Sequence, residues 1–420
     1  MDQQTEFQLD INRALKETLA LVLAGGRGSR LMALTNRESK PAVPFGGKYR
    51  IIDFPLSNCI NSGIRKISVL TQYRAHTLIH HIQRGWNFLR GEIGEFVELW
   101  PAQQQTAKER WYMGTADAVH QNLDLIKVHN PRYVLILAGD HIYKQNYAKL
   151  LAHHIESGAD ATVACVDVPI NEASGFGIVD VDENDQIIGF LEKPTEPPPS
   201  PRDPTVAFAS MGIYIFNADF LYEALEKDAE VEGSDHDFGK NIIPSNLGKA
   251  KLVAHRFARS CIYSMDRREP YWRDVGTVDA YWAASLDLVS VTPALDLYDT
   301  SWPIWTYQMQ RPPAKFVWDG DDRRGSAVQS ILSAGCVVSG GGVRRTVMFT
   351  DSRVNSFSYV EDSVLLPGVD VGRHARLKRC VVGSGTQIPE GLVVGEDPAE
   401  DARRYYRSEG GITLITRDMI

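Results

Sequence analysis

The chain has 420 residues, 43% hydrophobic and 23% charged, which is ordinary for a globular protein of two or three domains. Its formal net charge of −8 argues against nucleic-acid binding, and no apolar run approaches the ~20 residues that span a bilayer. The N-terminus is polar and acidic, and the five scattered cysteines fit a reducing compartment. We therefore expect a cytoplasmic protein with no nucleic-acid and no membrane partner.

The first two-thirds of the chain alternate strand-like and helix-like segments, which is typical of an α/β sheet. The predicted strands are residues 19–24, 64–71, 133–138, 161–168, 186–191 and 210–216, and residues 115–128 have a helical pattern. Because the central runs are apolar throughout, we expect their strands to be covered on both faces. The proline cluster at 197–201 predicts a surface loop.

From about residue 295 the pattern changes. A tract rich in Trp and Pro over residues 301–316 indicates a packed connector. Beyond it, apolar residues recur at a spacing of six, in groups whose phase slips: Val337, Val343 and Phe349; Val354 and Val360; Val371 and Leu377; Val382, Ile388 and Val394. Such hexads predict a parallel β-helix, in which each coil buries one apolar residue per side. The alternative is an antiparallel β domain with fortuitous spacing.

A glycine turn follows the first predicted strand. Gly25, Gly26 and Gly28 would let backbone N–H groups approach a phosphate closely. The turn matches neither the P-loop pattern nor the dinucleotide-binding fingerprint. The residues after it carry a local charge of +5, from Arg27, Arg30, Arg37, Lys40, Lys48 and Arg50 against Glu38 alone. We therefore favour phosphate binding over a purely structural turn.

Six motifs in register carry a family resemblance. They are LAGGRGSRL at 23–31 with KPA at 40–42, WYMGTADA at 111–118, AGDHIY at 138–143, EKP at 192–194, HDFGK at 236–240 and YWRDVGT at 271–277. Over nearly its whole length the chain resembles the bacterial glucose-1-phosphate adenylyltransferases, a family of sugar-nucleotide pyrophosphorylases. The resemblance implies a Rossmann-like α/β nucleotidyltransferase domain with a mixed, mostly parallel sheet at 1–295. It also implies a connector at 296–325 and a left-handed parallel β-helix at 326–420 for assembly and regulation.

The resemblance also implies an activity. ATP and α-D-glucose 1-phosphate would give ADP-glucose and pyrophosphate with Mg²⁺ as the cofactor, in the first committed step of bacterial glycogen synthesis. The family further implies a homotetramer and allosteric effectors that are phosphorylated or carboxylate metabolites.

Asp140 closely follows the apolar run at 133–138, so in an open parallel sheet it lies at the carboxyl end of a strand, where ligands bind. The family's pattern makes Arg30, Lys40, Asp140 and Asp274 the candidate catalytic residues, with Asp140 and Asp274 as the metal ligands. The candidate ATP-binding residues are Leu23, Ala24, Gly25, Gly26, Gln72, Tyr112, Gly114 and Thr115. Those for the sugar phosphate are Gly177, Glu192, Lys193, Ser210, Tyr214, Asp237, Phe238 and Trp272.

The candidate effector residues are Arg37, Lys40 and Arg50. Arg37 departs from the family, in which a lysine often stands at this place. Arginine keeps the charge but adds a bidentate fork for phosphate, so the two residues are not equivalent.

Two other functions stay open at this point. The chain could be a pyrophosphorylase for UTP or dTTP, or a non-catalytic regulatory subunit. A regulatory subunit could lose the five charged candidates Arg30, Lys40, Asp140, Lys193 and Asp274, and all five are present.

Overall fold

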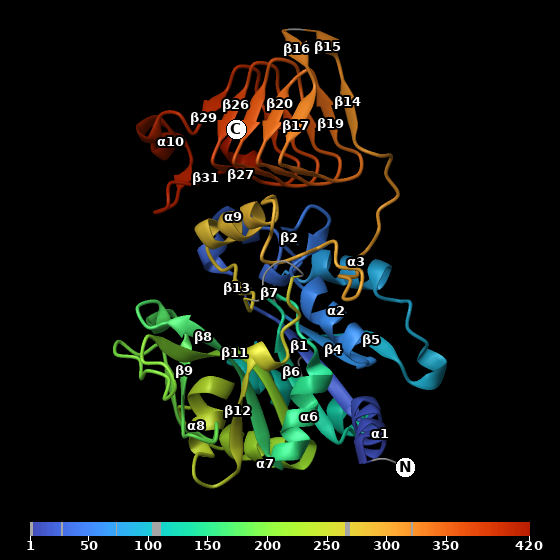
Figure 1. The fold of residues 1–420 in the computed structure, drawn as a ribbon, viewed down its shortest axis with the longest axis vertical. Helices are drawn as coiled ribbons and strands as arrows, with labels where there is room; N and C mark the ends of the chain where they lie inside the picture. The colour runs from blue at the N-terminus through green and yellow to red at the C-terminus, as the bar shows by residue number, and fades with distance from the viewer. Residues whose placement is uncertain (1–2, 27, 73, 103–110, 265–268, 321) are drawn as a thin grey trace.

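The protein is described here from a computed structural model that covers residues 3–26, 28–72, 74–102, 111–264, 269–320 and 322–420. Arg27 of the basic stretch therefore lies outside the described residues. The chain forms a sheet-and-helix domain on which a β-helix is stacked, with helix α9 (Val278–Asp287) lying between the two (Figure 1).

The first domain is built on a mixed sheet of nine strands. They are β1 (Thr18–Ala24), β4 (Lys66–Thr71), β5 (Phe96–Pro101), β6 (Tyr133–Ala138), β8 (Ala161–Pro169), β9 (Gly177–Val181), β10 (Ile187–Glu192), β11 (Val206–Asn217) and β12 (Leu252–Arg256). The strand order is β10-β9-β11-β6-β1-β4-β5, and β8 pairs with β11 and β12. Strands β6, β1, β4 and β5 run parallel, whereas the long β11 is antiparallel to β6 and β8. The runs predicted from the sequence thus form strands, with ends that differ by a few residues.

Helices cover both faces of this sheet (Figure 1). They are α1 (Gln3–Lys16), α2 (Asp53–Ser62), α3 (His76–Gly85), α4 (Thr115–His120), α5 (Leu123–Val128), α6 (Tyr147–Ser157), α7 (Ala218–Ala229) and α8 (Ile243–Ser245). Alternate residues of β1 enter different cores, since Ala20 and Val22 pack on one side and Leu19 and Leu21 on the other. The sheet is therefore buried on both faces, as its unbroken apolar strands predict.

The helix predicted over 115–128 is instead two short helices, α4 and α5. Between them the Asn122 side chain donates to the carbonyl oxygen of Ala118 at 2.8 Å and to the Tyr112 hydroxyl at 3.1 Å. Asparagine competes in this way with backbone hydrogen bonds, which explains the break.

The second domain is a parallel β-helix with three sheets. The first contains β14 (Lys315–Val317), β19 (Val337–Ser339), β22 (Arg353–Val354), β25 (Asp370–Val371) and β28 (Gln387–Ile388). The second contains β17 (Ser326–Val328), β20 (Gly342–Arg344), β23 (Tyr359–Glu361), β26 (Arg376–Lys378) and β29 (Val393–Val394). The third contains β18 (Ile331–Leu332), β21 (Val347–Met348), β24 (Val364–Leu365), β27 (Cys380–Val382) and β31 (Thr413–Ile415), with β30 (Tyr406–Arg407) antiparallel at its edge.

The slipping hexads follow from the length of a coil. The inward residues Val354, Val360, Leu365 and Val371 are separated by steps of six, five and six, so that one coil takes 17 residues. The first coil begins at Lys315, so the predicted boundary at residue 326 falls within it.

Short elements complete the fold. They are β2 (Pro44–Phe45) with β3 (Tyr49–Arg50), β7 (His141–Tyr143) with β13 (Trp272–Asp274), β15 (Asp319–Gly320) with β16 (Arg323–Arg324), and α10 (Pro398–Arg404).

The two domains share a continuous apolar core. Val278, Tyr281 and Ala284 of α9 belong to the same buried cluster as Val364 and Leu414 of the β-helix. The connector between the domains is also bound to α2. The Trp302 indole N–H donates to Asn58 at 2.9 Å, and the Thr306 hydroxyl donates to Asp53 at 2.6 Å. The domains are thus joined by packing as well as by the chain.

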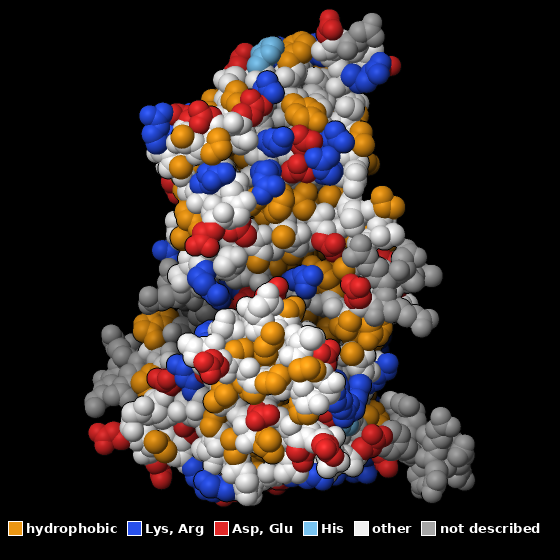
Figure 2. Space-filling model, turned by 60° about the vertical axis from the view of Figure 1, so that its left-hand side comes forward, with side chains coloured by type: hydrophobic (Ala, Val, Ile, Leu, Met, Phe, Trp, Pro, Cys, Tyr) orange, Lys and Arg blue, Asp and Glu red, His pale blue; other side chains and the backbone are white. Residues whose placement is uncertain are grey.

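On the face drawn in Figure 2, positive and negative side chains are interspersed. Within the residues that the structure describes, no helix is both long enough and apolar enough to cross a membrane.

The β-helix core yields a first prediction. Leu377 is 1% exposed, and replacing it by alanine should destabilise the β-helix by about 2–5 kcal/mol because it leaves a cavity. Thermal melting followed by circular dichroism checks this. Gln387 is exposed on a neighbouring sheet of the β-helix, so Gln387→Ala should change the free energy of unfolding by no more than about 0.5 kcal/mol. Equal melting of both variants would contradict the assignment of Leu377 to the core.

Candidate active site

A cleft of about 630 Å³ opens at the carboxyl ends of β1 and β6. This is the edge of an α/β sheet at which ligands bind. It brings together these sequence-predicted residues: Leu23, Gly25, Gly26, Arg30, Lys40, Gln72, Tyr112, Gly114, Thr115, Asp140, Gly177, Glu192, Lys193, Ser210, Tyr214, Asp237, Phe238 and Asp274.

The glycine turn forms one wall of the cleft and leads into the 3-10 helix η1 (Ser29–Thr35). Gly28 has φ +63°, and a Cβ there would lie 2.9 Å from the Cβ of Lys40. Only glycine fits this position without strain. The turn therefore packs directly against Lys40.

The Lys40 ammonium bridges two carboxylates deep in the cleft. Its Nζ lies 2.9 Å from Oδ2 of Asp140 and 2.6 Å from Oδ1 of Asp274, and the residue is 4% exposed. Burial by itself would lower the pKa of Lys40, but the charges of the two carboxylates outweigh it and the pKa is raised. Burial would raise the pKa of Asp140, yet the neighbouring His141 and Lys40 hold it at about 2.

Different segments bring these three side chains together. Asp140 follows β6, and the N–H of Gly139 donates to the carbonyl of Leu23 at 3.0 Å, which fixes this turn beside the glycine turn. Asp274 ends β13, whose only strand partner among the described residues is β7. Arg30 lies at the entrance, 67% exposed, with Nη2 3.6 Å from Oδ2 of Asp274.

One end of the cleft holds the residues predicted for the sugar phosphate. Lys193 is exposed, and its Nζ lies 2.9 Å from Oε1 of Glu192. The Thr115 hydroxyl donates to Oδ2 of Asp237 at 2.8 Å, and Oδ1 of Asp237 accepts from the N–H of Gly239 at 2.9 Å. The Asp237 carboxylate is therefore fixed in place.

The other end holds Gln72 and Tyr112. Burial raises the pKa of Tyr112, so its hydroxyl stays protonated at neutral pH and can donate a hydrogen bond. Between the two ends, Gly114 approaches the chain at His236 so closely that a Cβ would lie 2.2 Å from that carbonyl oxygen.

Two predicted residues do not line the cleft. Ala24 is 1% exposed inside β1. Trp272 was expected beside the sugar, but it is 6% exposed and packs behind His141 and Phe176, with ring centroids 4.9 and 5.5 Å apart. The Trp272 ring therefore supports the wall rather than forming it.

The three candidate effector residues lie at different places. Lys40 is in the large cleft, whereas Arg37 lines a small cleft of about 80 Å³ at the domain junction and pairs with Asp418 at 2.8 Å. Arg50 lines neither of these clefts; it pairs with the partly buried Glu38 at 3.0 Å and donates to the Ala42 carbonyl. Glu38 itself lines the small cleft beside Arg37, so Lys40 is the candidate that the fold places at a different cleft.

Sequence reasoning missed several lining residues, among them His141, Phe176, Gly212 and Gly276. His141 stands next to Asp140 in a motif that the sequence analysis quotes, so position alone could have found it. Gly276 likewise stands two residues after Asp274 in the motif at 271–277, and the structure adds the reason for glycine there, since a Cβ would lie 2.9 Å from Oδ1 of Asp274.

Residues 19–290 match the family model described as nucleotidyl transferase, and residues 312–415 match the one described as GlmU-like, C-terminal hexapeptide. A glucose-1-phosphate adenylyltransferase of Rhodospirillum rubrum is 74% identical over 100% of this chain and 99% of its own length. Proteins of the same name from Paramagnetospirillum magneticum and Dechloromonas aromatica are 60% and 56% identical, over 100% of this chain and 98% and 95% of theirs. The chain belongs to the glucose-1-phosphate adenylyltransferase family. It is a nucleotidyltransferase, and its hexapeptide region supports the left-handed sense of the β-helix.

The cleft also contains side chains that could bind a divalent cation. Asp140, His141 and Asp274 each offer a ligand atom, and these atoms lie within 4.8 Å of one another. Carboxylate oxygens are the ligands that hard divalent cations prefer. The residues therefore fit such an ion.

Replacing Lys40 by methionine tests the ion-paired group. In the unchanged protein the Asp140 carboxylate has a pKa below its ordinary 3.8, so its contribution to stability is present above that pH and is lost only as the pH falls toward about 2. In Lys40→Met the ammonium between the two carboxylates is lost and the more distant Arg30, 3.6 Å from Asp274, remains, so protonation should relieve the repulsion between the carboxylates at a higher pH. We expect the gap in melting temperature between the two proteins to be widest near pH 7 and to narrow below about pH 4.

The control is Lys127→Met, since this exposed lysine pairs only with Glu226 at 3.0 Å among the described residues. Its effect should be small, as is usual for exposed pairs. A difference in melting temperature between Lys40→Met and the unchanged protein that stays constant down to pH 3 would contradict the electrostatic coupling of Lys40 to the two carboxylates.

Proposed function

We propose that this chain joins ATP and α-D-glucose 1-phosphate to give ADP-glucose and pyrophosphate. An oxygen of the sugar phosphate attacks the α-phosphorus of ATP, the bond from that phosphorus to the bridging oxygen of the β-phosphate breaks, and pyrophosphate leaves in line. The observation that carries the proposal is the group of Lys40, Asp140 and Asp274 beside the glycine turn. Such a reaction needs positioning and charge neutralisation rather than a nucleophilic side chain.

The ATP end has the donors that a triphosphate requires. Backbone N–H groups of Gly25 and Gly26 can approach phosphate oxygens, and the exposed guanidinium of Arg30 is free to stabilise the leaving pyrophosphate. We assign recognition of adenine to Gln72 and Tyr112, through hydrogen bonding and packing.

At the sugar end, Lys193 would bind the phosphate of glucose 1-phosphate. Glu192 and Asp237 would accept hydrogen bonds from sugar hydroxyls. The contacts of Asp237 with Thr115 and Gly239, which hold its carboxylate in one rotamer, support this role. A carboxylate that is fixed before the sugar binds loses less entropy on binding.

Asp140 and Asp274 would hold Mg²⁺, the ion that we propose for this site. When bound, such a cation neutralises phosphate charge and orients the reacting oxygens. The two carboxylates are the residues that position it, and Lys40 keeps their charges compensated.

Pyrophosphate release from purified protein with glucose 1-phosphate and Mg²⁺, compared among ATP, UTP and dTTP, tests the function. We expect strong preference for ATP. Preference for UTP or dTTP would move the chain to another pyrophosphorylase, and no turnover with any nucleotide would favour a regulatory subunit.

In the same assay, Lys193→Gln should raise KM for glucose 1-phosphate at least tenfold and change KM for ATP much less, because it removes one phosphate contact at the sugar end. Lys240→Gln, an exposed lysine paired with Asp235, is the control. Equal effects of Lys193→Gln on both KM values would contradict its role.

For regulation, we propose that an anionic metabolite binds at the junction cleft. There Arg37 and Arg417 lie close to Asp418, and an anion would compete with Asp418 for Arg37. Arg37→Gln should abolish stimulation by whichever of fructose 6-phosphate, fructose 1,6-bisphosphate or pyruvate activates the unchanged enzyme, and should leave basal turnover intact. Retained stimulation would place the effector elsewhere.

Assembly is proposed through the β-helix. Among the described strands, β14, β17 and β18 of its first coil pair on one edge only, and Phe316, Trp318 and Val328 are 46%, 53% and 61% exposed. Unpaired edges with exposed apolar residues favour association. The homotetramer, the cytoplasmic location and the role in bacterial glycogen synthesis stay predictions.

A further inference from the structure

Asp274 is supported from both sides along the chain. It ends β13, a strand of three residues outside the nine-stranded sheet, and Val275, Gly276 and Thr277 then lead directly into α9. The Thr277 hydroxyl caps this helix by accepting from the N–H of Ala280 at 3.1 Å. By contrast, Asp140 follows the central strand β6. The pairing of Asp274 with His141 and the contact with Lys40 place Asp274 beside Asp140, and α9 is the support that holds the chain where it leaves Asp274.

The β-helix holds the first turns of α9 at two side chains. Asp279 accepts from the Ser408 hydroxyl at 2.5 Å and from the N–H of Gly410 at 3.3 Å. A Cβ at residue 410 would lie 2.5 Å from Asp279, so the contact is tight.

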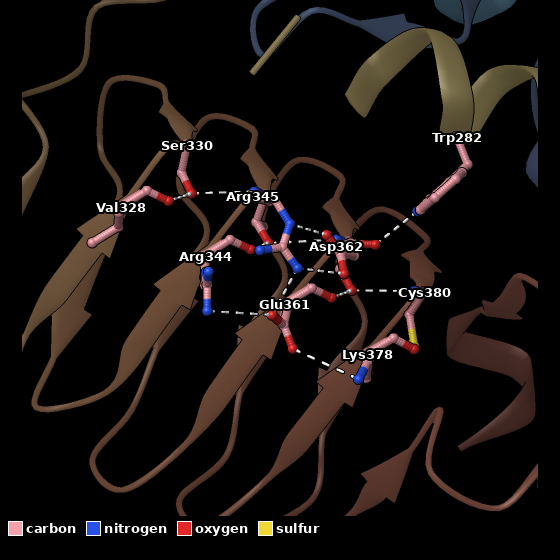
Figure 3. A network of polar contacts seen from close by, with 11 residues as sticks. Trp282, Val328, Ser330, Arg344, Arg345, Glu361, Asp362, Lys378 and Cys380 are labelled. Carbon is pink, nitrogen blue, oxygen red and sulfur yellow. Dashed lines mark hydrogen bonds and ion pairs between the residues drawn. The ribbon is translucent and has the colours of Figure 1, made fainter. Parts of the chain in front are cut away.

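Trp282 makes the second contact. Its indole N–H donates to the Asp362 carbonyl at 2.7 Å, and the Arg379 guanidinium lies 5.0 Å from its ring centroid. Arg379 also donates to the Gly410 carbonyl at 2.9 Å, which joins the two contacts. In Figure 3 the Trp282 side chain extends from α9 to the corner of the coil at Asp362.

The coil corner is itself held rigidly. Asp362 has φ +49°, and its carboxylate accepts from Nε and Nη2 of Arg345 at 2.6 and 2.8 Å. Glu361 extends this network to Arg344 and Lys378, which lie farther from α9 (Figure 3). A bidentate arginine fixes a carboxylate in one geometry.

We infer that Asp279 and Trp282 are positioning residues, through which the β-helix holds α9 and with it the metal-binding carboxylate of Asp274. This inference rests on the proposed function in one respect, the assignment of Asp274 to the metal. It gives the β-helix a part in catalysis that does not require an effector.

The test compares Trp282→Phe, Asp279→Ala and the double variant with the unchanged full-length protein. Mn²⁺ binding is measured by electron paramagnetic resonance of the free ion, with saturating ADP-glucose and no pyrophosphate, so that no turnover occurs. We expect the double variant to bind Mn²⁺ about 10–100-fold more weakly, as is typical when the support of a metal ligand is removed. Its kcat should fall, while KM for ATP stays near the unchanged value.

Two controls match the variants. Trp305→Phe removes an indole N–H that donates to Asn61 at 3.1 Å, away from α9. Lys378→Met removes an outer member of the network in Figure 3. Both variants should keep the Mn²⁺ affinity of the unchanged protein, even if their melting temperatures are lower. A residue with a merely structural role affects the melting temperature and leaves the Mn²⁺ affinity unchanged.

Asp274→Asn separates the two claims. If it weakens Mn²⁺ binding and the double variant does not, the positioning role is overturned. If Asp274→Asn leaves Mn²⁺ binding unchanged, the assignment of Asp274 to the metal fails, and the positioning role is then judged by the kcat of the double variant. A normal kcat overturns the positioning role. A lowered kcat with an unchanged KM for ATP supports it. If the double variant does not fold, Trp282→Phe, which keeps an aromatic ring, is judged by the same criteria.

Discussion

The contact of one buried ammonium with two carboxylates is the constraint on which the active cleft depends. Lys40, Asp140 and Asp274 come from three separate segments, and the Lys40 ammonium could not be buried without the two carboxylates except at a large cost in desolvation. Together they compensate one another and fix the distance between the two carboxylates. The glycine turn packs on Lys40 and Arg30 contacts Asp274, so the turn and the arginine that we propose for phosphate binding both adjoin this one group.

Charge balance of this kind also suits the reaction. A cleft that must accept two polyanions cannot be strongly negative, and one with only free cations would bind product as tightly as substrate. Here Lys40 and Arg30 are both within reach of Asp274, so phosphate groups and a cation can arrive together and keep the site nearly neutral. For this charge balance Asp140 has to stay ionised at neutral pH, and its pKa of about 2 keeps it so.

The sequence predicted those parts of the fold that local pattern determines. The apolar run at 133–138 is β6, and the hexads from Val354 onward are inward positions of the β-helix coils. In the first hexad group, Val338 and Met348 face that core in place of the predicted Val337 and Phe349. The family motifs predicted most residues of the cleft, because the segments that contain these motifs all meet at the same edge of the sheet. What failed depended on three-dimensional direction: Trp272 packs behind the wall, and Lys40 lines the large cleft whereas Arg37, three positions before it, lines the small one. Pattern and charge counts carry no information on which way such side chains point.

The domain junction could not be read from the sequence at all, and its backbone shows why. Turns of the β-helix use left-handed backbone at many of their corners, where glycine serves at Gly335, Gly368 and Gly385 and other residues serve at Asp351, Phe357 and His374. At the corner near α9 the same backbone is adopted by Arg345, Asp362 and Arg379, at φ between +43° and +51°. Side chains other than glycine are strained there, so a compensating interaction is required. The Arg345–Asp362 pair supplies part of it within the β-helix, and the contact of Arg379 with Trp282 is added where the corner meets a helix from the other domain. Glycine would make that corner an easier turn, but at residue 379 it would remove the guanidinium that contacts α9.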